Sequence, residues 1–341
     1  MSALLFSVLS GAPTYAQVKD LEEMVRAATL APSGHNAQPW KFKVYPTCIE
    51  IYPDFTRALP VVDPNNRELY ICLGCAAENL ILAANNMGYA ADFSVEATSR
   101  DCYYIRIVLN RDETFPDELL NEIPRRQTNR SLFNGIEIPD EAMDRIMGEI
   151  RYPGTGAHAI SRKSSKFMDI TRLVQEGNVI QMSDVLFKEE LLEWIRFNKQ
   201  QKQKHADGLS YDVMGIPAVP AAIGRKILHL FLKPGMQSKT DLKKLQASSH
   251  LVLFTVSEDH PKYWILLGRN LERFLLTASE QGVSCAFNNQ PCEVPELMHK
   301  VQEVTNTGPE IPVLLLRLGY AGPVAYAPRI SPGAVVEFNL P

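Results

Sequence analysis

An internal repeat restricts the possible folds of this chain more than any other feature of its sequence. The pattern from Leu73 to Gly88 returns, without a gap, as the pattern from Leu267 to Gly282, an offset of 194 residues (267 minus 73). Self-similarity of this kind is typical of a duplicated structural unit. Both copies predict a helix, because their apolar residues follow helical spacing and a terminal glycine suits the left-handed residue that ends a helix. The chain should therefore fold as two similar halves.

The second half is longer than the first. The pattern Glu-x-Met-x-Arg at Glu22 returns at Glu141, an offset of only 119 (141 minus 22), so the second half carries about 75 additional residues (194 minus 119) before its repeated helix. We predict halves at 17–124 and 125–338, with an insertion at about 150–245. Insertions of this length are commonly lids or binding loops.

The insertion should contain helices on both sides of a centre rich in turn-forming residues. Apolar residues with helical spacing occur at 187–195 and at 227–231, and the segment from Asp207 to Pro220 between them is rich in Gly and Pro. If the insertion is a lid, this centre is the part expected closest to the ligand.

Strands are expected at 40–45 and 49–52 as a hairpin, and at 103–109, 250–256 and 313–318. A helix is expected over Leu21–Ala28, with Asp20 near its start. Because strands and helices do not simply alternate, the pattern favours an α+β class over a doubly wound one.

Composition excludes several classes of partner. The chain has 341 residues, of which 45% are hydrophobic and 22% charged, values typical of globular proteins. The net charge of -4 gives no basic face for nucleic acid, and the basic run Lys199–Lys204 is interpreted as a solvated helix face or loop. No stretch reaches the ~18 apolar residues of a membrane span, so we expect no membrane partner.

The N-terminal residues 3–9 have the length of the apolar core of a signal peptide, but no Lys or Arg precedes them. A cytoplasmic location is therefore expected, with export as the alternative. Six cysteines in so long a chain indicate reduced thiols. Cys72 and Cys75 lie inside the repeated helix, which favours core packing over redox chemistry, and no metal site is expected.

Three polar segments are candidates for ligand binding. The loop 31–40 reads Ala-Pro-Ser-Gly-His-Asn-Ala-Gln-Pro-Trp, and Gly34 would permit close approach of a ligand to its backbone. The segment 124–130 carries three arginines and a threonine, donors suited to phosphate, although a solvated basic turn is the alternative. The third segment places Arg317 inside an apolar strand and ends at Arg329.

Together these segments resemble the nitroreductase superfamily. The loop 31–40 is similar to the loop after the first long helix of that family, and Arg126-x-Thr128-x-Arg130 resembles its phosphate motif. The longer spelling at 125–130, with Asn-Gln-Pro at 289–291 and Leu-Arg-Leu-Gly-Tyr at 316–320, resembles its long single-chain Acg-like branch. The resemblance covers about 17–338 and implies a nitroreductase-like fold of mixed, mainly antiparallel sheets flanked by helices.

The resemblance implies FMN as the cofactor. Its phosphate would be held by Arg126, Thr128, Arg130 and Arg329. Pro32, Ser33 and Asn36 would approach the flavin from the other half, and the loop containing Asn288 and Asn289 would lie near the reactive edge. Lys244, or its neighbour Lys243, would match a lysine near the pyrimidine edge, with a solvated helix lysine as the alternative.

The repeat adds a prediction of stoichiometry. Family members are homodimers in which each FMN contacts both subunits. Here the first half has the loop at 32–36 but no arginine motif, whereas the second half has the arginine motif but reads Ile150-Arg151-Tyr152-Pro153-Gly154 at the position of the loop. We therefore predict an intramolecular pseudo-dimer with one complete FMN site, with further oligomerisation possible.

The implied function is an FMN-dependent oxidoreductase that transfers hydride or electrons from NAD(P)H to a small organic acceptor. No side-chain nucleophile is required, because the flavin carries the chemistry. The alternative is a flavin-binding or flavin-storage protein with little or no turnover, in which the insertion closes over the flavin.

Overall fold

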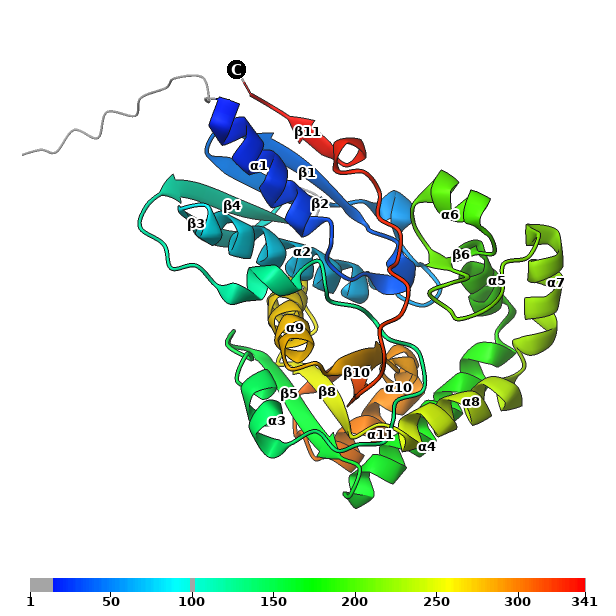
Figure 1. Cartoon of the computed structure of the whole chain (residues 1–341). Coiled ribbons are helices and arrows are strands. Elements are labelled where there is room, and N and C mark those ends of the chain that lie inside the picture. Colours follow the sequence, from blue (N-terminus) through cyan, green and yellow to red (C-terminus); the bar gives the residue numbers. More distant parts are fainter. Residues whose placement is uncertain (1–14, 99–101, 341) are drawn as a thin grey trace, which may run out of the picture.

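The computed structural model describes residues 15–98 and 102–340, and these form two large sheets with helices between and around them, together with a short two-stranded sheet (Figure 1). The apolar N-terminal stretch 3–9 therefore lies outside the described residues. The first half contains α1 (Tyr15–Ala28), β1 (Trp40–Tyr45), β2 (Cys48–Pro53), α2 (Arg67–Asn86), β3 (Tyr89–Ala97) and β4 (Tyr103–Arg111). The second half contains α3 (Asp140–Met147), β5 (Thr155–Ser161), β8 (His250–Val256), α9 (Pro261–Glu280), β9 (Ser284–Phe287), α10 (Gln290–Glu293), α11 (Pro295–Thr305) and β10 (Ile311–Gly319).

The two sheets have the same strand order. In the first half the order is β1-β2-β4-β3, and in the second it is β5-β8-β10-β9, with all of these neighbours antiparallel. The repeated helix follows the second strand in each half. The duplication seen in the sequence is thus present in the topology, and the predicted α+β class is confirmed.

The two repeated helices pack directly on each other. A Cβ added to Gly74 of α2 would lie 2.1 Å from the carbonyl oxygen of Ile265, and one added to Gly268 of α9 would lie 2.0 Å from that of Ile71. The contact is reciprocal, because each glycine meets the residue three positions before the other glycine. Contacts of this kind occur across a two-fold axis. Figure 1 shows α2 beside the first sheet and α9 beside the second.

Between β5 and β8 the second half contains residues 162–249, where the first half has only the two residues between β1 and β2. This insertion contains α4 (Ser165–Ser183), α5 (Val185–Glu193), β6 (Ile195–Arg196), α6 (Lys199–His205), β7 (Leu209–Ser210), α7 (Ala221–Phe231) and α8 (Pro234–Gln246). The range of 150–245 expected from the sequence also includes β5, which belongs to the second sheet.

The middle of the insertion forms a helical group apart from both sheets, with its own apolar cluster. Phe187, Ile195, Phe197 and Leu232 pack there against Leu59 of the first half. Figure 1 shows α5, α6 and α7 at one side of the molecule. The helical group thus rests on the first half although it belongs to the second.

The C-terminal segment crosses from the second sheet to the first. After β10, residues 320–335 run along the molecule without regular strands, and β11 (Val336–Phe338) pairs in parallel with β1 (Figure 1). The side chain of Gln127 holds this segment in place. Its Nε2 donates to the carbonyl oxygen of Val324 at 2.6 Å, and its Oε1 accepts from the N–H of Val324 at 3.1 Å. The crossing brings Arg329 from the second half to the loop 31–40 of the first.

Most local predictions from the sequence are confirmed. The hairpin, the strands around 103–109, 250–256 and 313–318, and the basic helix α6 are present. Gly88 and Gly282 have φ of 76° and 67°, as expected for residues that end helices. The prediction that α1 starts near Asp20 is wrong, since the helix starts at Tyr15, and Ile195 belongs to β6 rather than to a helix.

The cysteines are free in the described part of the chain, and all but Cys102 are buried. Cys72 and Cys75 lie in the core, and Cys75 Sγ donates to the carbonyl oxygen of Gly268 at 3.1 Å. Burial raises the pKa of both thiols. Core packing, as predicted, is therefore their role. No helix in the described residues is long and apolar enough to span a membrane.

Candidate functional site

The loop 31–40 has an unusual backbone. His35, Asn36 and Gln38 have φ of 50°, 55° and 55°, although none of them is glycine. Left-handed conformations at such residues are strained and are kept only where the surrounding structure determines them. Here the backbone N–H of Gln38 donates to Ser33 Oγ at 2.9 Å and closes the turn. The loop is thus held in one shape, which is typical of a ligand-binding segment.

The side chains of this loop connect three distant parts of the chain. Asn36 Nδ2 donates to the carbonyl oxygens of Pro328 at 2.9 Å and of Gly208 at 3.2 Å. Gln38 Nε2 donates to the carbonyl oxygen of Ala206 at 3.0 Å, while its Oε1 accepts from the N–H of Ile330 at 2.9 Å. The centre of the insertion and the C-terminal crossing segment therefore both lie against the loop.

Arg126 and Arg329 converge behind the loop. Both donate through Nη2 to the carbonyl oxygen of Leu30, at 3.1 and 3.0 Å, and Arg329 Nη1 also donates to Asn36 Oδ1. Burial, followed by repulsion from Arg126, lowers the pKa of Arg329 to about 9. Two guanidinium groups are thus held close together in a region of low dielectric, which is costly unless an anion accompanies them.

The acidic group near this pair is Glu272, which is fully buried. Arg126 Nε lies 3.5 Å from Glu272 Oε1, too far for a good hydrogen bond, and both atoms lack a hydrogen-bond partner. Burial raises the pKa of Glu272 to about 7. The carboxylate therefore neutralises the two arginines only in part.

The repeat partner of Glu272 has a very different environment. Glu78 pairs with Arg269 at 2.7 Å and with Arg273 at 3.2 Å, and it accepts from the hydroxyl of Tyr152 at 3.2 Å. Arg269 also lies between the rings of Phe93 and Tyr152, at 4.3 and 4.2 Å from their centroids. At this related position the arginines are paired with Glu78 or packed against aromatic rings. Around Glu272, by contrast, the Nε donor of Arg126 has no hydrogen-bond partner in the described part of the chain.

A second cationic group lies farther along the same segment. The pKa of Arg130 is lowered by burial, and Arg130 has no ion pair or hydrogen bond to another described residue. Its positive charge contributes to lowering the pKa values of His35, Lys244 and Arg317, in each case after burial, so these groups lie near it. The pKa of His35 falls to about 4, which leaves its ring neutral at pH 7.

Thr128 sits between the two cationic groups. It forms a parallel bridge with Cys285 of β9, and the N–H of Asn129 donates to the carbonyl oxygen of Cys285 at 2.8 Å. In this extended segment alternate side chains share a face, so Arg126, Thr128 and Arg130 lie in a row. Arg125 points away from the row and pairs with Glu122 at 2.9 Å on the surface.

The two asparagines in the loop after β9 differ in whether their side chains are free to bind a ligand. Asn289 is used by the protein itself, since its Oδ1 accepts from the N–H of Leu315 at 3.0 Å and its Nδ2 donates to Glu68 at 3.1 Å. Asn288 is buried, and its Oδ1 has no hydrogen-bond partner. Of the two predicted asparagines, Asn288 thus has the side chain available to a ligand. Pro32 is buried in the loop, and Lys244 is half-buried near Arg130 rather than solvated.

Glu68, at the start of α2, was not among the residues predicted for the site. Its carboxyl lies 3.4 Å from the position of a Cβ on Gly34, and it is hydrogen bonded to Glu293 in α10. Burial and repulsion from Glu293 and Asp63 raise its pKa well above the ordinary range. A hydrogen bond between two carboxyls requires a proton on one of them, so the pair of Glu68 and Glu293 favours a shared proton beside the loop. Glu68 and Glu293 are 225 residues apart (293 minus 68), a pairing that no local pattern reveals.

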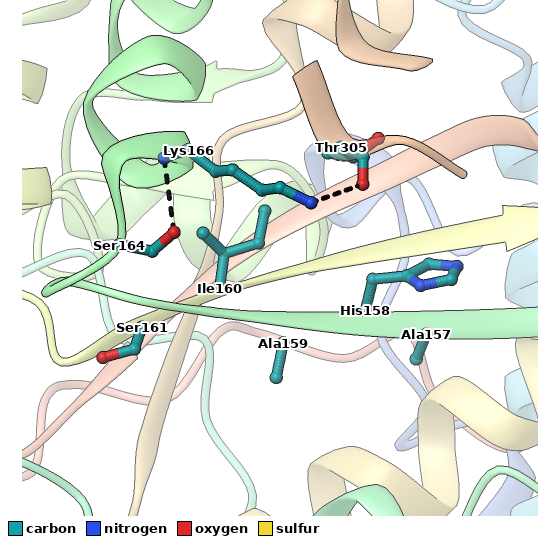
Figure 2. A pocket seen from close by; sticks show the side chains of 8 residues that line it. All are labelled: Ala157, His158, Ala159, Ile160, Ser161, Ser164, Lys166 and Thr305. Atoms are coloured by element: carbon teal, nitrogen blue, oxygen red, sulfur yellow. Dashed lines mark hydrogen bonds between the residues drawn. The ribbon is translucent and has the colours of Figure 1, made fainter. Parts of the chain in front are cut away.

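Several buried polar atoms around the loop 31–40 and the arginine segment have no partner in the described part of the protein, and their chemistry indicates the kind of ligand that fits. The buried atoms Arg126 Nε, Arg317 Nη1 and Asn288 Oδ1 lack hydrogen-bond partners, and Arg130 lacks an anion. Unpaired cationic groups in a partly buried row indicate an anionic ligand with a polar body. A surface hollow of about 380 Å³ beside β5, lined by His158, Lys166 and Thr305 among others (Figure 2), contains none of these residues and is separate from the site.

Glu272 should give the stability of the ligand-free protein a specific pH dependence. Its pKa is about 7 in the folded chain and 4.5 in the reference state, so the folded state holds the proton more tightly. The stabilising contribution is complete below pH 4.5 and is lost as the pH rises through 7. Chemical denaturation from pH 4.5 to 8 should show a loss of about 3 kcal/mol relative to Glu272→Gln. Exposed Glu303→Gln is the control, and parallel curves for wild type and Glu272→Gln would contradict the assignment.

Comparison with known proteins agrees with the sequence resemblance. The model of the nitroreductase family matches residues 14–69, which include α1, the loop 31–40 and the first hairpin. Two curated relatives from Mycobacterium tuberculosis, strains CDC 1551 / Oshkosh and H37Rv, are each named "Putative NAD(P)H nitroreductase". Each is 25% identical over 338 residues, covering 95% of this chain and 93% of the relative.

Solved structures are similar at a greater distance. The FMN-dependent nitroreductase NfnB from Mycobacterium smegmatis, in complex with NADPH, is 12% identical and covers 64% of this chain and 96% of its own, with a TM-score of 0.43. A nitroreductase with bound FMN from Bacteroides fragilis is 12% identical, covers 64% and 97%, and has a TM-score of 0.39. The sequence comparisons, which include both the loop 31–40 and nearly the whole length, confirm the resemblance of this chain to the nitroreductase superfamily.

Proposed function

We propose that the chain is an FMN-dependent oxidoreductase that takes hydride from NAD(P)H and passes hydride or electrons to a small organic acceptor. The observation that carries this proposal is the row of Arg126, Thr128 and Arg130 beside the strained loop 31–40: the buried Nε of Arg126 has no hydrogen-bond partner, and the partly buried Arg130 has no anionic partner among the described residues. The family of the curated relatives, and the FMN bound by the more distant solved structures, support the choice of flavin among anionic ligands.

The two cationic groups suggest a division of roles. Arg126 and Arg329 converge on one point, as forked donors do around a phosphate, and Thr128 adds a hydroxyl. Arg130 lies at the end of the row and Lys244 of α8 lies near it, so we assign both to the pyrimidine edge of the isoalloxazine, in place of the phosphate role first expected for Arg130. A positive charge there favours the reduced, anionic form of a flavin. Ser33, Pro32 and Asn36 present the loop to the ring from the first half, and Asn288 approaches from β9.

We further propose that the two halves form an intramolecular pseudo-dimer with one cofactor site. The equal strand order of the sheets and the reciprocal contact of Gly74 with Gly268 support this arrangement. At the related position, Tyr152, Arg269 and Glu78 fill the space with a closed set of contacts. The second site would thus be occupied by the protein itself.

When bound, FMN supplies the hydride-transfer chemistry, and the chain supplies orientation, charge and access. The raised pKa values of Glu68 and Glu293 favour a proton held between them next to the loop, and neutral His35 adds no positive charge that would compete with Arg130. No carboxylate faces Arg130 among the described residues, so its charge remains available to the ligand.

The direct test is the absorption spectrum of the purified protein, followed by reconstitution with excess FMN. We expect a flavin spectrum and one FMN per chain. The symmetry-related position lacks both parts of the site, because the first half has no arginine motif and the second half has no loop like 32–36. Anaerobic addition of NADH or NADPH should bleach the flavin band. A colourless protein that binds no FMN would contradict the proposal, and two FMN per chain would contradict the pseudo-dimer.

A second candidate is flavin binding without turnover, and the position of the insertion favours it specifically. Asp207 pairs with Arg57 of the first half and, at 2.6 Å, with Arg196, while Gly208 and Ala206 bond to Asn36 and Gln38. The insertion is thus fastened over the loop and restricts access to it. Bound FMN that NAD(P)H reduces very slowly or not at all would identify this function.

The insertion should control access to the flavin. Replacing residues 205–222 by a short Gly-Ser linker removes Asp207 and the bonds of Ala206 and Gly208, so the loop 31–40 becomes more exposed. We expect FMN to remain bound while sulfite and bulky acceptors react with it faster. Stopped-flow absorption measures this rate. An unchanged rate with a complete flavin spectrum would show that the segment does not cover the ring.

A further inference from the structure

One face of α7 exposes apolar side chains to solvent. Ile223 and Ile227 are 52% and 41% exposed, and they lie one helical turn apart on the same face. The adjacent face is packed, since a Cβ on Gly224 would lie 2.3 Å from the ring of Phe197, and Leu228 contacts the apolar cluster of the insertion. The apolar surface of this helix is therefore only partly covered by the protein.

The chain around this face is strongly basic. From Val213 to Thr240 there is no Asp or Glu, while Arg225, Lys226, Lys233 and Lys239 give a formal charge of +4 (four basic residues, no acidic ones). All four are exposed. The whole chain has a net charge of -4, so this segment is opposite in sign to the rest of the molecule.

Apolar and basic residues on one exposed helix need a partner that offers both an apolar layer and negative charge. A second copy of the chain does not, because a two-fold contact through α7 would place two segments of charge +4 against each other. An anionic bilayer does, because apolar side chains enter the boundary of the acyl chains while lysines and arginines contact headgroups. Figure 1 shows α7 at the outer edge of the molecule, away from both sheets.

We propose that the outer face of α7, defined by Ile223, Ile227, Arg225 and Lys226, docks on the surface of an anionic lipid membrane. The helix lies in the interface and does not cross it. Whole-chain composition, which favours no membrane partner, averages this segment with the acidic remainder of the molecule. The inference concerns an exposed surface and does not depend on the proposed cofactor.

The test is co-sedimentation of the full chain with vesicles of phosphatidylcholine, alone or mixed with phosphatidylglycerol. We expect binding to the mixed vesicles that is at least about tenfold stronger than to the neutral ones and that weakens with salt. Ile223→Ser/Ile227→Ser and Arg225→Gln/Lys226→Gln should each reduce binding to the mixed vesicles about tenfold or more. Because all four side chains are exposed, circular dichroism should show that both variants remain folded.

Phe115→Ser is the matched control. Phe115 is 93% exposed but lies between Asp112, Glu113, Asp117 and Glu118, so its loss should leave vesicle binding unchanged. Equal binding to neutral and mixed vesicles, or no binding to either, would overturn the proposal. So would a concentration-dependent dimer in sedimentation velocity that the isoleucine variant abolishes, since α7 would then be a protein interface.

Discussion

Gly74→Ala should destabilise the protein by about 3 kcal/mol or more, because overpacking of a rigid core against backbone atoms cannot relax as it can against a flexible side chain. The added Cβ would lie 2.1 Å from the carbonyl oxygen of Ile265 and 2.9 Å from Gly268 Cα. The two repeated helices would have to separate along their whole contact. Urea denaturation followed by circular dichroism measures the loss as a shift of the midpoint.

Gly268→Ala should cost a similar amount, since its Cβ would lie 2.0 Å from the carbonyl oxygen of Ile71. The double variant should cost much less than the sum, because helices already separated by one methyl group accommodate the second. Gly235→Ala in α8 is the control, as a Cβ there has no atom within 4 Å, and it should not destabilise the protein. Additive losses, or a small loss at Gly74, would show that the helices do not meet as described.

Arg126→Ala should weaken FMN binding by about 1.5 to 3 kcal/mol, the typical value of a charge-assisted hydrogen bond to an ionised group. Arg126 is buried, is directed with Arg329 at one point, and has an unsatisfied Nε. Fluorescence titration with FMN should show the dissociation constant rising by roughly one to two powers of ten. Riboflavin, which lacks the phosphate, should bind equally to the wild type and the variant.

A structural effect of this substitution must be separated from loss of phosphate contacts, because alanine removes the nearer of the two positive charges beside Glu272. Arg126→Ala/Glu272→Gln removes both charges and should recover stability while FMN affinity stays low. Arg125→Ala removes an exposed arginine of the same segment, paired only with Glu122, and should leave the affinity unchanged. An equal loss of riboflavin and FMN affinity would mean that Arg126 only supports the fold.

The sequence predicted those parts of the fold that depend on local patterns. The helices ending at Gly88 and Gly282 follow from apolar spacing and from the conformational freedom of glycine, and the hairpin 40–53 follows from alternation around a short turn. The strand Val336–Phe338 could not be predicted in this way. It has three residues and is a strand only because it pairs with Phe42–Val44, 294 positions away (336 minus 42).

The candidate site stays a prediction, but both of its contiguous motifs were found from the sequence. Arg126 reaches the start of the loop 31–40 through the carbonyl oxygen of Leu30, and Arg329 reaches Asn36 in the same loop. The roles of Glu272 and Glu68 were missed, because a glutamate in a helix has no pattern that reports what it meets across the fold. For Glu272 a signal did exist, since the repeat places a glutamate at the same position of both helices, Glu78 and Glu272, amid apolar residues.

The C-terminal crossing segment also imposes an order on the assembly of the molecule during synthesis. The first half leaves the ribosome early, yet the outer edge of β1 is paired only when Val336–Phe338 has been made, and Arg329 reaches Asn36 at the same stage. A contact between positions so far apart is formed slowly, since a long loop must close first. Residues 336–338 thus complete the first sheet, and a chain not yet extended past Arg329 lacks one side of the candidate site.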